Sequence, residues 1–427
     1  MFLNPQYKLT QHFLFIISIS LTNTAIIEAA EWKTEPSVFI KSQYNDNVRM
    51  RSDNSNPESS TGFTLEPRLK LAGEEINLWD MAIDARGKIT RFQDIEDGDS
   101  ENIFFVFDGG RQTERTNWRL NTSYERNSNF DTDFDTENSD AGLLLDDHTE
   151  QETISILPSV KWSMSEISQL SVSLNSIGVA YDEVTNLAYQ DYDYDSIVVN
   201  AYWVVSEVHQ LGFTSTYSDY DSPGASFSYE QAIFEIDYTY KINQISDIGL
   251  SVGGRRLDST LTNGQIVGCE QAGEFEALGQ CVFSAPILAD ITSESDGTVV
   301  NISYNSKTEL VSHSFTAGRT VSPSSFGGAQ EIRSANYQLK IDNTERFSTH
   351  LILDTTETET VSGVDSSNDR VRYRVEPSVN YKLSKNWNLN LMYRFIDQNI
   401  SNSDEDSTSN AIFLNLYLHW PKLATTY

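Results

Sequence analysis

The feature that most constrains this sequence is a long run of alternating apolar and polar residues at positions 370–395. A first arm places apolar side chains at every second position, and a second arm repeats the pattern after a short turn at 384–386. Because side chains on a β-strand point to opposite faces in turn, each arm has one apolar and one polar face. Each arm is as long as a tilted strand must be to cross a bilayer, about ten residues. The run therefore predicts a hairpin of a transmembrane β-barrel.

The same alternation recurs along the chain. A first strand is expected at 36–49, and apolar residues occupy alternate positions over 63–71, 79–85, 118–124, 154–162, 197–205, 232–240, 335–341 and 412–420. The pattern predicts an all-β fold, a transmembrane antiparallel up-and-down barrel. Counting the weaker segments gives about eighteen strands, with sixteen as the alternative, since bacterial barrels have even strand numbers. The many Tyr and Phe residues also suit strands.

Connections between the expected strands alternate between short and long. Tight turns are expected at 206–207, 242–244, 306–307, 343–345 and 384–386, and long polar loops at 127–150, 258–295, 360–369 and 397–409. Outer-membrane barrels have short periplasmic turns and long extracellular loops. The tight turns are therefore expected on the periplasmic side, together with both chain ends.

All seven tryptophans lie beside the expected tight turns or near the two ends of the mature chain, at Trp32, Trp79, Trp118, Trp162, Trp203, Trp387 and Trp420. Indole prefers the interface between lipid tails and headgroups, and membrane barrels carry aromatic girdles there. A soluble sandwich would not collect every tryptophan at one end of its strands. The distribution therefore predicts one aromatic rim on a membrane barrel.

The N-terminal segment predicts that the chain leaves the cytoplasm, and the charge balance bears on its partners. Lys8 precedes a short apolar run at 13–21, and small residues follow near 25–30, which predicts a signal peptide over residues 1–30 with the exact cleavage position open. Residues 31–427 are then expected to form a single barrel domain in the outer membrane of a Gram-negative bacterium, in contact with membrane lipid and lipopolysaccharide. The net charge of −32 argues against nucleic acid as a partner, because phosphates need cationic groups.

Two cysteines, Cys269 and Cys281, lie close together in one expected loop. In an oxidising compartment they predict a disulfide that closes the loop. A metal site would need further His or Cys ligands nearby, and the loop has none, so we expect no metal or other cofactor. Alternating aspartates at 131–135 and 191–195 resemble the start of a calcium loop without its later glycine and glutamate. Solvated acids are therefore favoured there over loose binding of divalent cations.

The polar face of each expected strand indicates what lines the barrel interior. If the apolar set meets lipid, the residues expected to line the lumen include Arg68, Lys70, Arg86, Lys88, Arg119, Lys340, Arg372, Arg374, Glu376 and Arg394. Pairing across the turn at 384–386 puts Glu376 opposite Arg394, where opposite charges attract. An ion pair that stiffens the wall is the favoured interpretation. The alternative is a basic stripe of Arg372, Arg374 and Arg394 in contact with an acidic solute.

The sequence gives little support to an enzyme. It contains neither a Gly-x-Ser-x-Gly nucleophile elbow nor a His-Glu-x-x-His metal motif. His313 and His350 lie in expected strands near several serines, so a Ser–His hydrolase stays open as an alternative. Isolated His and Ser residues on a polar strand face are usually structural or solvated, and we therefore do not expect an enzyme.

Short motifs on the expected strands resemble those of a known family. They are Tyr44-Asn45-Asp46-Asn47, Phe63-x-Leu65-Glu66-Pro67-x-Leu69, Val375-Glu376-Pro377-Ser378 and Tyr381-x-Leu383-Ser384-x-Asn386-Trp387. In these motifs and in its layout, the mature chain is similar to the outer-membrane β-barrel porin family that is often encoded beside exopolysaccharide biosynthesis genes. The resemblance implies a barrel that takes part in the export of an extracellular polysaccharide, with that polymer and periplasmic export components as partners. One departure is the tail at 421–427, which leaves open whether Trp420 or Tyr427 is the terminal aromatic signal.

Three functions follow from these expectations. The first, implied by the resemblance, is passive passage of an exported polysaccharide through a polar, charged lumen. The second, which needs only the barrel, is a general or solute-specific diffusion porin. The third is a surface receptor or adhesion barrel that acts through its acidic loops.

Overall fold

The structure of the protein is a computed structural model. It describes residues 31–54, 56–75, 78–95, 98–128, 149–182, 189–266, 287–324, 328–363, 369–400, 405–420 and 423–426. The expected signal peptide, both cysteines and the aspartates at 131–135 lie outside these residues. No α-helical membrane span is found in the described part of the chain.

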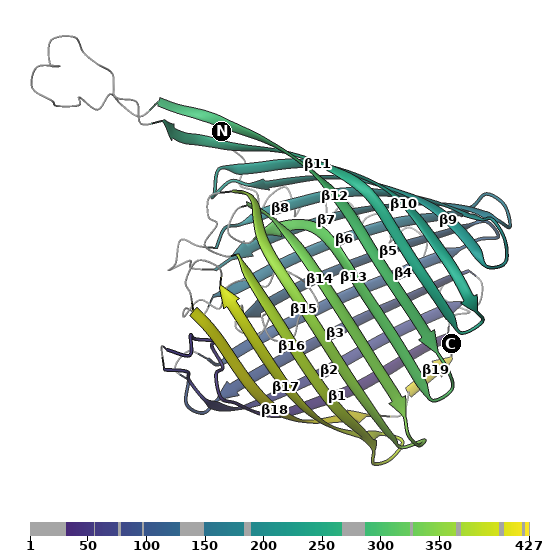
Figure 1. Cartoon of the computed structure of the whole chain (residues 1–427). Coiled ribbons are helices and arrows are strands. Elements are labelled where there is room, and N and C mark those ends of the chain that lie inside the picture. Colours follow the sequence, from purple (N-terminus) through teal and green to yellow (C-terminus); the bar gives the residue numbers. More distant parts are fainter. Residues whose placement is uncertain are drawn as a thin grey trace, which may run out of the picture.

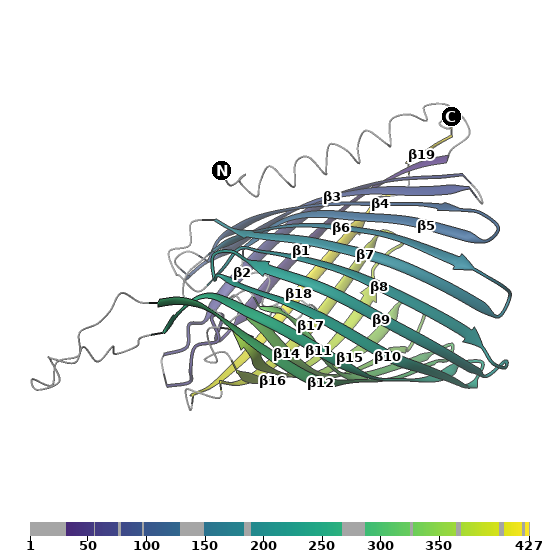
Figure 2. The same ribbon diagram turned by 90° about the horizontal axis from the view of Figure 1, so that it is seen from above.

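The described residues form one continuous antiparallel sheet that closes into a barrel (Figure 1, Figure 2). Its strands are β1 (Glu31–Asn45), β2 (Ser60–Glu75), β3 (Trp79–Phe92), β4 (Ser100–Gln112), β5 (Thr116–Ser128), β6 (Glu150–Ser163), β7 (Ser168–Tyr181), β8 (Tyr192–Val204), β9 (His209–Ser222), β10 (Phe227–Asn243), β11 (Ser246–Ile266), β12 (Ile287–Lys307), β13 (Val311–Ser324), β14 (Gly328–Asp342), β15 (Phe347–Gly363), β16 (Arg370–Lys382), β17 (Trp387–Ile400), β18 (Glu405–His419) and β19 (Leu423–Thr426). Each strand from β2 to β17 pairs with the strands before and after it, which is the up-and-down order predicted.

The barrel closes where the first strand meets the last ones. β1 pairs with β2 along one edge and with β18 along the other, where residues 37–45 lie opposite 411–419. The short β19 takes the place of β18 beside residues 31–34 of β1. Within the described residues the wall is therefore eighteen strands around, and the predicted strand number is confirmed.

The two faces of the wall differ in polarity. On β10, Phe234 and Ile236 point outward with 56% and 61% of their surfaces exposed. Asp237, on the opposite face, accepts a hydrogen bond from Thr214 of β9 at 2.7 Å. Similar exposed or half-exposed apolar side chains surround the barrel from β1 to β18. A monomer in water rarely exposes such a continuous apolar band, whereas lipid would cover it.

The tryptophan rim is also confirmed. Trp79, Trp118 and Trp387 lie at the starts of their strands, and Trp162 and Trp203 lie at the ends of theirs, all at the tight-turn end of the barrel. The Trp32 and Trp79 rings lie 6.2 Å apart across neighbouring strands.

Hydroxyl side chains close several of the tight turns. The Oγ atoms of Thr113, Ser206, Thr308 and Thr344 each accept a hydrogen bond from the backbone N–H three residues later, at 2.9–3.2 Å. Ser and Thr stabilise turns by this contact. The predicted tight turns are found within two or three residues of their expected positions, and the turn predicted at 306–307 lies at 308–310.

Three of the four predicted long loops are shorter than expected, because several strands continue past the apolar band, whereas the loop predicted at 127–150 lies between β5 and β6 as expected. β11 and β12 run through much of the predicted loop at 258–295, and their hairpin projects beyond the rest of the barrel in Figure 1. β15, β17 and β18 likewise enter the loops predicted at 360–369 and 397–409, and the first strand begins before residue 36. Backbone hydrogen bonds hold a strand pair together without apolar side chains. The end of the apolar alternation was therefore a wrong marker for the end of a strand.

Candidate functional site

A polar cavity of about 630 Å³ lies inside the barrel, against the wall where the chain closes on itself. β1, β2, β3, β16, β17 and β18 contribute to it. Its lining residues are Ser37, Val38, Phe39, Lys41, Glu66, Arg68, Arg86, Asn380, Asn390, Met392, Arg394, Phe413, Asn415, Tyr417 and His419. We call this space the closure cavity.

Strand alternation explains why these residues, with the exception of Val38, point inward. On β18, Ile412 and Leu414 lie on the outer surface, so Phe413 and Asn415 between them face the interior. The same rule turns Lys41 of β1 inward, because its register partner on β18 is Asn415. The closure cavity is therefore lined by the polar complement of the lipid-facing stripes.

A buried ion pair forms one side of the closure cavity. The Nε of Arg394 donates a hydrogen bond to Oε2 of Glu376 at 2.7 Å, and the two side chains are only 7% and 10% exposed. The Arg394 guanidinium also lies 4.9 Å from the centre of the Phe413 ring, within cation–π range. The register predicted for this hairpin is confirmed by this contact.

Three asparagines continue the inner surface of this wall. Asn415 of β18 donates to Asn390 of β17, and Asn390 donates to Asn380 of β16, both at 2.8 Å. The Asn415 Oδ1 atom is buried and has no hydrogen-bond partner among the described residues. We call this chain of amides the asparagine ladder, and all three of its residues line the closure cavity. Amide groups can bind hydroxyl or amine groups.

Aromatic rings lie beside the ladder. Phe39 and Tyr417 have their ring centres 4.6 Å apart, and the Lys41 amine lies 5.7 Å from the centre of the Phe413 ring. Cations over ring faces, together with neighbouring amides, form a surface that suits solutes with both polar groups and apolar faces.

Two further arginines predicted to line the lumen reach the same cavity. Arg68 forms a bidentate pair with Asp84 of β3, with its Nε 2.9 Å from each carboxylate oxygen. Arg86 lies 3.5 Å from Glu66 and stacks 4.0 Å from the centre of the Phe104 ring. Both arginines thus keep a fixed direction while lining the cavity.

The other predicted lumen residues lie on the inner face but away from the closure cavity. Arg119 of β5 pairs with Asp108, with its Nε 3.0 Å from Oδ2, and Lys340 of β14 lies 3.4 Å from Asp342. The remaining inner-face residues of this set are Lys70 on β2, Lys88 on β3, and Arg372 and Arg374 on β16. The proposed stripe of Arg372, Arg374 and Arg394 is therefore only partly assembled at the cavity.

Sequence reasoning missed most of the residues that line the cavity. It read the apolar positions of the last strand and left out Phe413, Asn415 and Tyr417 between them, and it assigned no faces to the first strand, which carries Phe39 and Lys41. The alternation on both strands was the signal that would have found them.

Neither a catalytic nor a metal site emerges from the described residues. The His313 ring nitrogen lies 2.8 Å from the Tyr337 hydroxyl on the outer face, while His350 lies on the inner face of β15, opposite Lys340. The described part of the chain contains no group of His, Cys, Asp or Glu residues suited to hold a metal ion. Asp193 and Asp195 belong to β8 rather than to a loop, which corrects that prediction.

No protein-family model matches the sequence, and no curated protein matches it. Among solved structures, the chain is similar to Acinetobacter baumannii OccAB2, with 12% identity, 92% of this chain and 98% of that chain covered, and a TM-score of 0.48. It is similar to Pseudomonas aeruginosa OccK2 (OpdF) in complex with glucuronate, with 11% identity, 91% and 98% covered, and a TM-score of 0.48. It is also similar to the ferric-catecholate import receptor Fiu from E. coli K12, with 7% identity, 90% and 81% covered, and a TM-score of 0.46. Similarity at this level does not identify a solute.

Proposed function

We propose that this chain is an outer-membrane channel through which hydrophilic solutes diffuse passively. The closed wall, the outer apolar band and the polar inner face support this proposal, because they are the features of outer-membrane barrels. The tight turns and the tryptophan rim belong on the periplasmic side, and the β11–β12 hairpin on the outer side.

The closure cavity is the observation that carries the proposal. Its lining has more cations than carboxylates: Lys41, Arg68, Arg86 and Arg394 against Glu66. Two of these arginines are paired with carboxylates outside the lining set, so the excess of positive charge is small. We therefore expect the cavity to favour anionic and neutral polar solutes over cations, although the chain as a whole is strongly acidic.

Two arginines on one strand allow a matched test. Arg86 of β3 points into the cavity, whereas Arg91 of the same strand lies on the outer face and contacts Glu101. Purified protein in planar bilayers with a salt gradient should report a lower anion-to-cation permeability ratio for Arg86→Gln. The control Arg91→Gln should leave that ratio unchanged. Equal effects of the two substitutions, or no conductance from the intact protein, would overturn the proposal.

A second candidate is the export of a polysaccharide, which the family resemblance implies and which stays a prediction. The asparagine ladder and the rings of Phe39, Phe413 and Tyr417 favour it, because amides bind hydroxyl groups and ring faces pack against the apolar faces of sugars. Deletion of the gene should then trap polymer in the periplasm. Unchanged export in the deletion strain would remove this candidate and leave the diffusion channel in place. The receptor alternative depends largely on loops outside the described residues.

A further inference from the structure

The barrel wall is split between β12 and β13 at its loop end. The two strands pair only from Val300 and Arg319 down to Lys307 and Ser312. Beyond that point β12 continues along β11 alone, and β13 continues along β14 alone. Residues 287–299 of β12 therefore have no partner strand on the β13 side among the described residues.

The separated ends of β13, β14 and β15 lie inside the barrel. We call residues 320–324, 328–332 and 358–363 the tip segment. Its Val321 and Ala329 belong to an apolar cluster with Tyr220, Tyr229 and Leu257. These last three residues point inward, because they alternate with the lipid-facing residues of β9–β11. The tip segment therefore packs against the inner wall instead of continuing the outer one.

Hydrogen bonds fix this position. The fully buried Tyr220 donates from its hydroxyl to the backbone oxygen of Ser324 at 3.1 Å. The hydroxyl groups of Ser259 on β11 and Ser362 on β15 lie 2.6 Å apart. Strands separated by three others in the wall are thus in direct contact across the mouth of the barrel.

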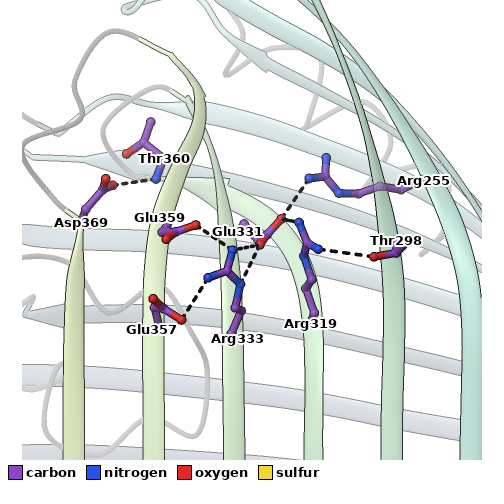
Figure 3. Close-up of polar contacts among 9 residues, drawn as sticks. All are labelled: Arg255, Thr298, Arg319, Glu331, Arg333, Glu357, Glu359, Thr360 and Asp369. Carbon is purple, nitrogen blue, oxygen red and sulfur yellow. Dashed lines mark hydrogen bonds and ion pairs between the residues drawn. The ribbon is translucent and has the colours of Figure 1, made fainter.

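An ion network spans the split (Figure 3). Glu331 of β14 accepts hydrogen bonds from Arg255 of β11 at 3.0 Å and from Arg319 of β13 at 2.5 Å. Arg319 also donates to Oγ1 of Thr298 on β12 at 3.4 Å. The Arg255 and Glu331 side chains are only 3% and 4% exposed, so this pair is shielded from water.

Arg333 extends the network onto β15. It donates to Glu331 at 3.0 Å and lies 3.1 Å from Glu357 and 2.8 Å from Glu359 (Figure 3). The ends of β14 and β15 are therefore tied together by charge as well as by backbone pairing. We expect the tip segment to move as one unit.

We propose that the tip segment is a gate at the outer mouth of the channel, and that the structure shows its closed state. In the open state it leaves the inner wall and pairs with the vacant edge of β12. Continuing the Val300–Arg319 register would place residues 320–324 opposite 295–299. Apolar burial and the Arg255–Glu331 pair stabilise the closed state, whereas backbone hydrogen bonds between the tip segment and β12 stabilise the open state. Buried Arg255 Nη1 and Ser322 Oγ have no hydrogen-bond partner among the described residues, which lowers the cost of opening.

A reversible crosslink tests the gate. Ser259→Cys with Ser362→Cys, in a chain whose Cys269 and Cys281 are replaced by Ser, would lock the tip segment when oxidised. The control pair, Ser246→Cys with Ser306→Cys, joins neighbouring strands at the tight-turn end, where the two hydroxyls lie 2.9 Å apart.

We expect oxidation of the gate pair to reduce conductance in planar bilayers by at least about twofold, reversed by dithiothreitol, and the oxidised control to conduct normally. Failure of the gate pair to crosslink, or full conductance once it has crosslinked, would overturn the gate. The gate rests on the proposed channel, and the conductance of the reduced protein tests that channel separately.

A second variant tests the gate without a crosslink. Glu331→Gln removes the charge that holds Arg255 and Arg319 at the split, so the ratio of closed to open channels should fall by about 100-fold. Single-channel recording measures the open fraction directly. An open fraction equal to that of the intact protein would refute the role assigned to Glu331 in holding the gate closed.

Discussion

The Glu376–Arg394 pair allows a quantitative prediction about the barrel wall. Replacing Glu376 with Gln keeps the shape of the side chain but removes the charge that balances the buried Arg394 guanidinium. The two groups are 2.7 Å apart and nearly buried, so the lost interaction is not replaced by exposed solvent. The substitution should therefore destabilise the barrel.

The magnitude follows from the geometry. Two unit charges about 4 Å apart attract by about 4 kcal/mol at an effective dielectric constant of about 20. The amide oxygen of Gln can still accept the hydrogen bond from Arg394 Nε, which offsets about 1 kcal/mol of the loss. We therefore expect Glu376→Gln to lower the free energy of unfolding by about 3 kcal/mol.

The neighbouring Glu66–Arg86 pair is the matched control. Its charged atoms are 3.5 Å apart, and its side chains are 17% and 38% exposed. Exposed pairs contribute about 0.5 kcal/mol, so Glu66→Gln should have a much smaller effect. Urea unfolding in lipid vesicles, followed by tryptophan fluorescence, measures both changes.

A double-mutant cycle separates the pair from its surroundings. Removing both charges, with Glu376→Gln and Arg394→Gln, should recover most of the lost stability, because no buried charge is left unbalanced. The reasoning is refuted if Glu376→Gln costs no more than Glu66→Gln, or if the coupling energy of the cycle is near zero.

Three further results are expected. A Cβ on Gly253 would lie 2.0 Å from the backbone oxygen of Phe234, so Gly253→Ala should lower the free energy of unfolding by about 2 kcal/mol. The control Gly254→Ala, whose Cβ would meet nothing nearer than 3.9 Å, should be nearly neutral in the same urea titration. Asn390→Leu breaks both hydrogen bonds of the asparagine ladder and should lower the free energy of unfolding by about 2 kcal/mol. Asn399→Ala, on the outer face, should lower it by less than about 0.5 kcal/mol. Similar losses for the two variants would contradict a structural role for the ladder. In vesicles, lipids brominated near the headgroup should quench the tryptophan fluorescence more than lipids brominated at the chain ends, and the opposite order would exclude a rim at the interface.

Most of the fold could be predicted from the alternation of apolar and polar residues along single strands. It gave the barrel, the strand number, the tryptophan rim and, through the short turn at 384–386, the contact of Glu376 with Arg394. These are local features, because a tight turn fixes the register of the two strands that it joins. Such contacts can be read directly from neighbouring positions.

The features that alternation did not reveal depend on residues far apart in the chain. Lys41 meets Phe413 only because the first and last strands pair. Val321 meets Tyr220 only because the ends of β13–β15 fold inward. In the sequence, the apolar residues of these strand ends cannot be told apart from residues that face lipid. The polar ends of strands beyond the apolar band were not predicted for another reason. Backbone hydrogen bonds hold them together, and these leave no pattern of apolar residues in the sequence.

The position of the closure cavity links the working site to assembly. Its lining comes from β1–β3 on one side and β16–β18 on the other, so no part of the chain made early holds the complete site. Until β18 reaches β1, both strands keep bare edges that favour aggregation. An intermediate stalled before that step would expose those edges and could not select solutes. The pairing of β18 with β1 thus closes the pore and completes the site that selects solutes in the same step.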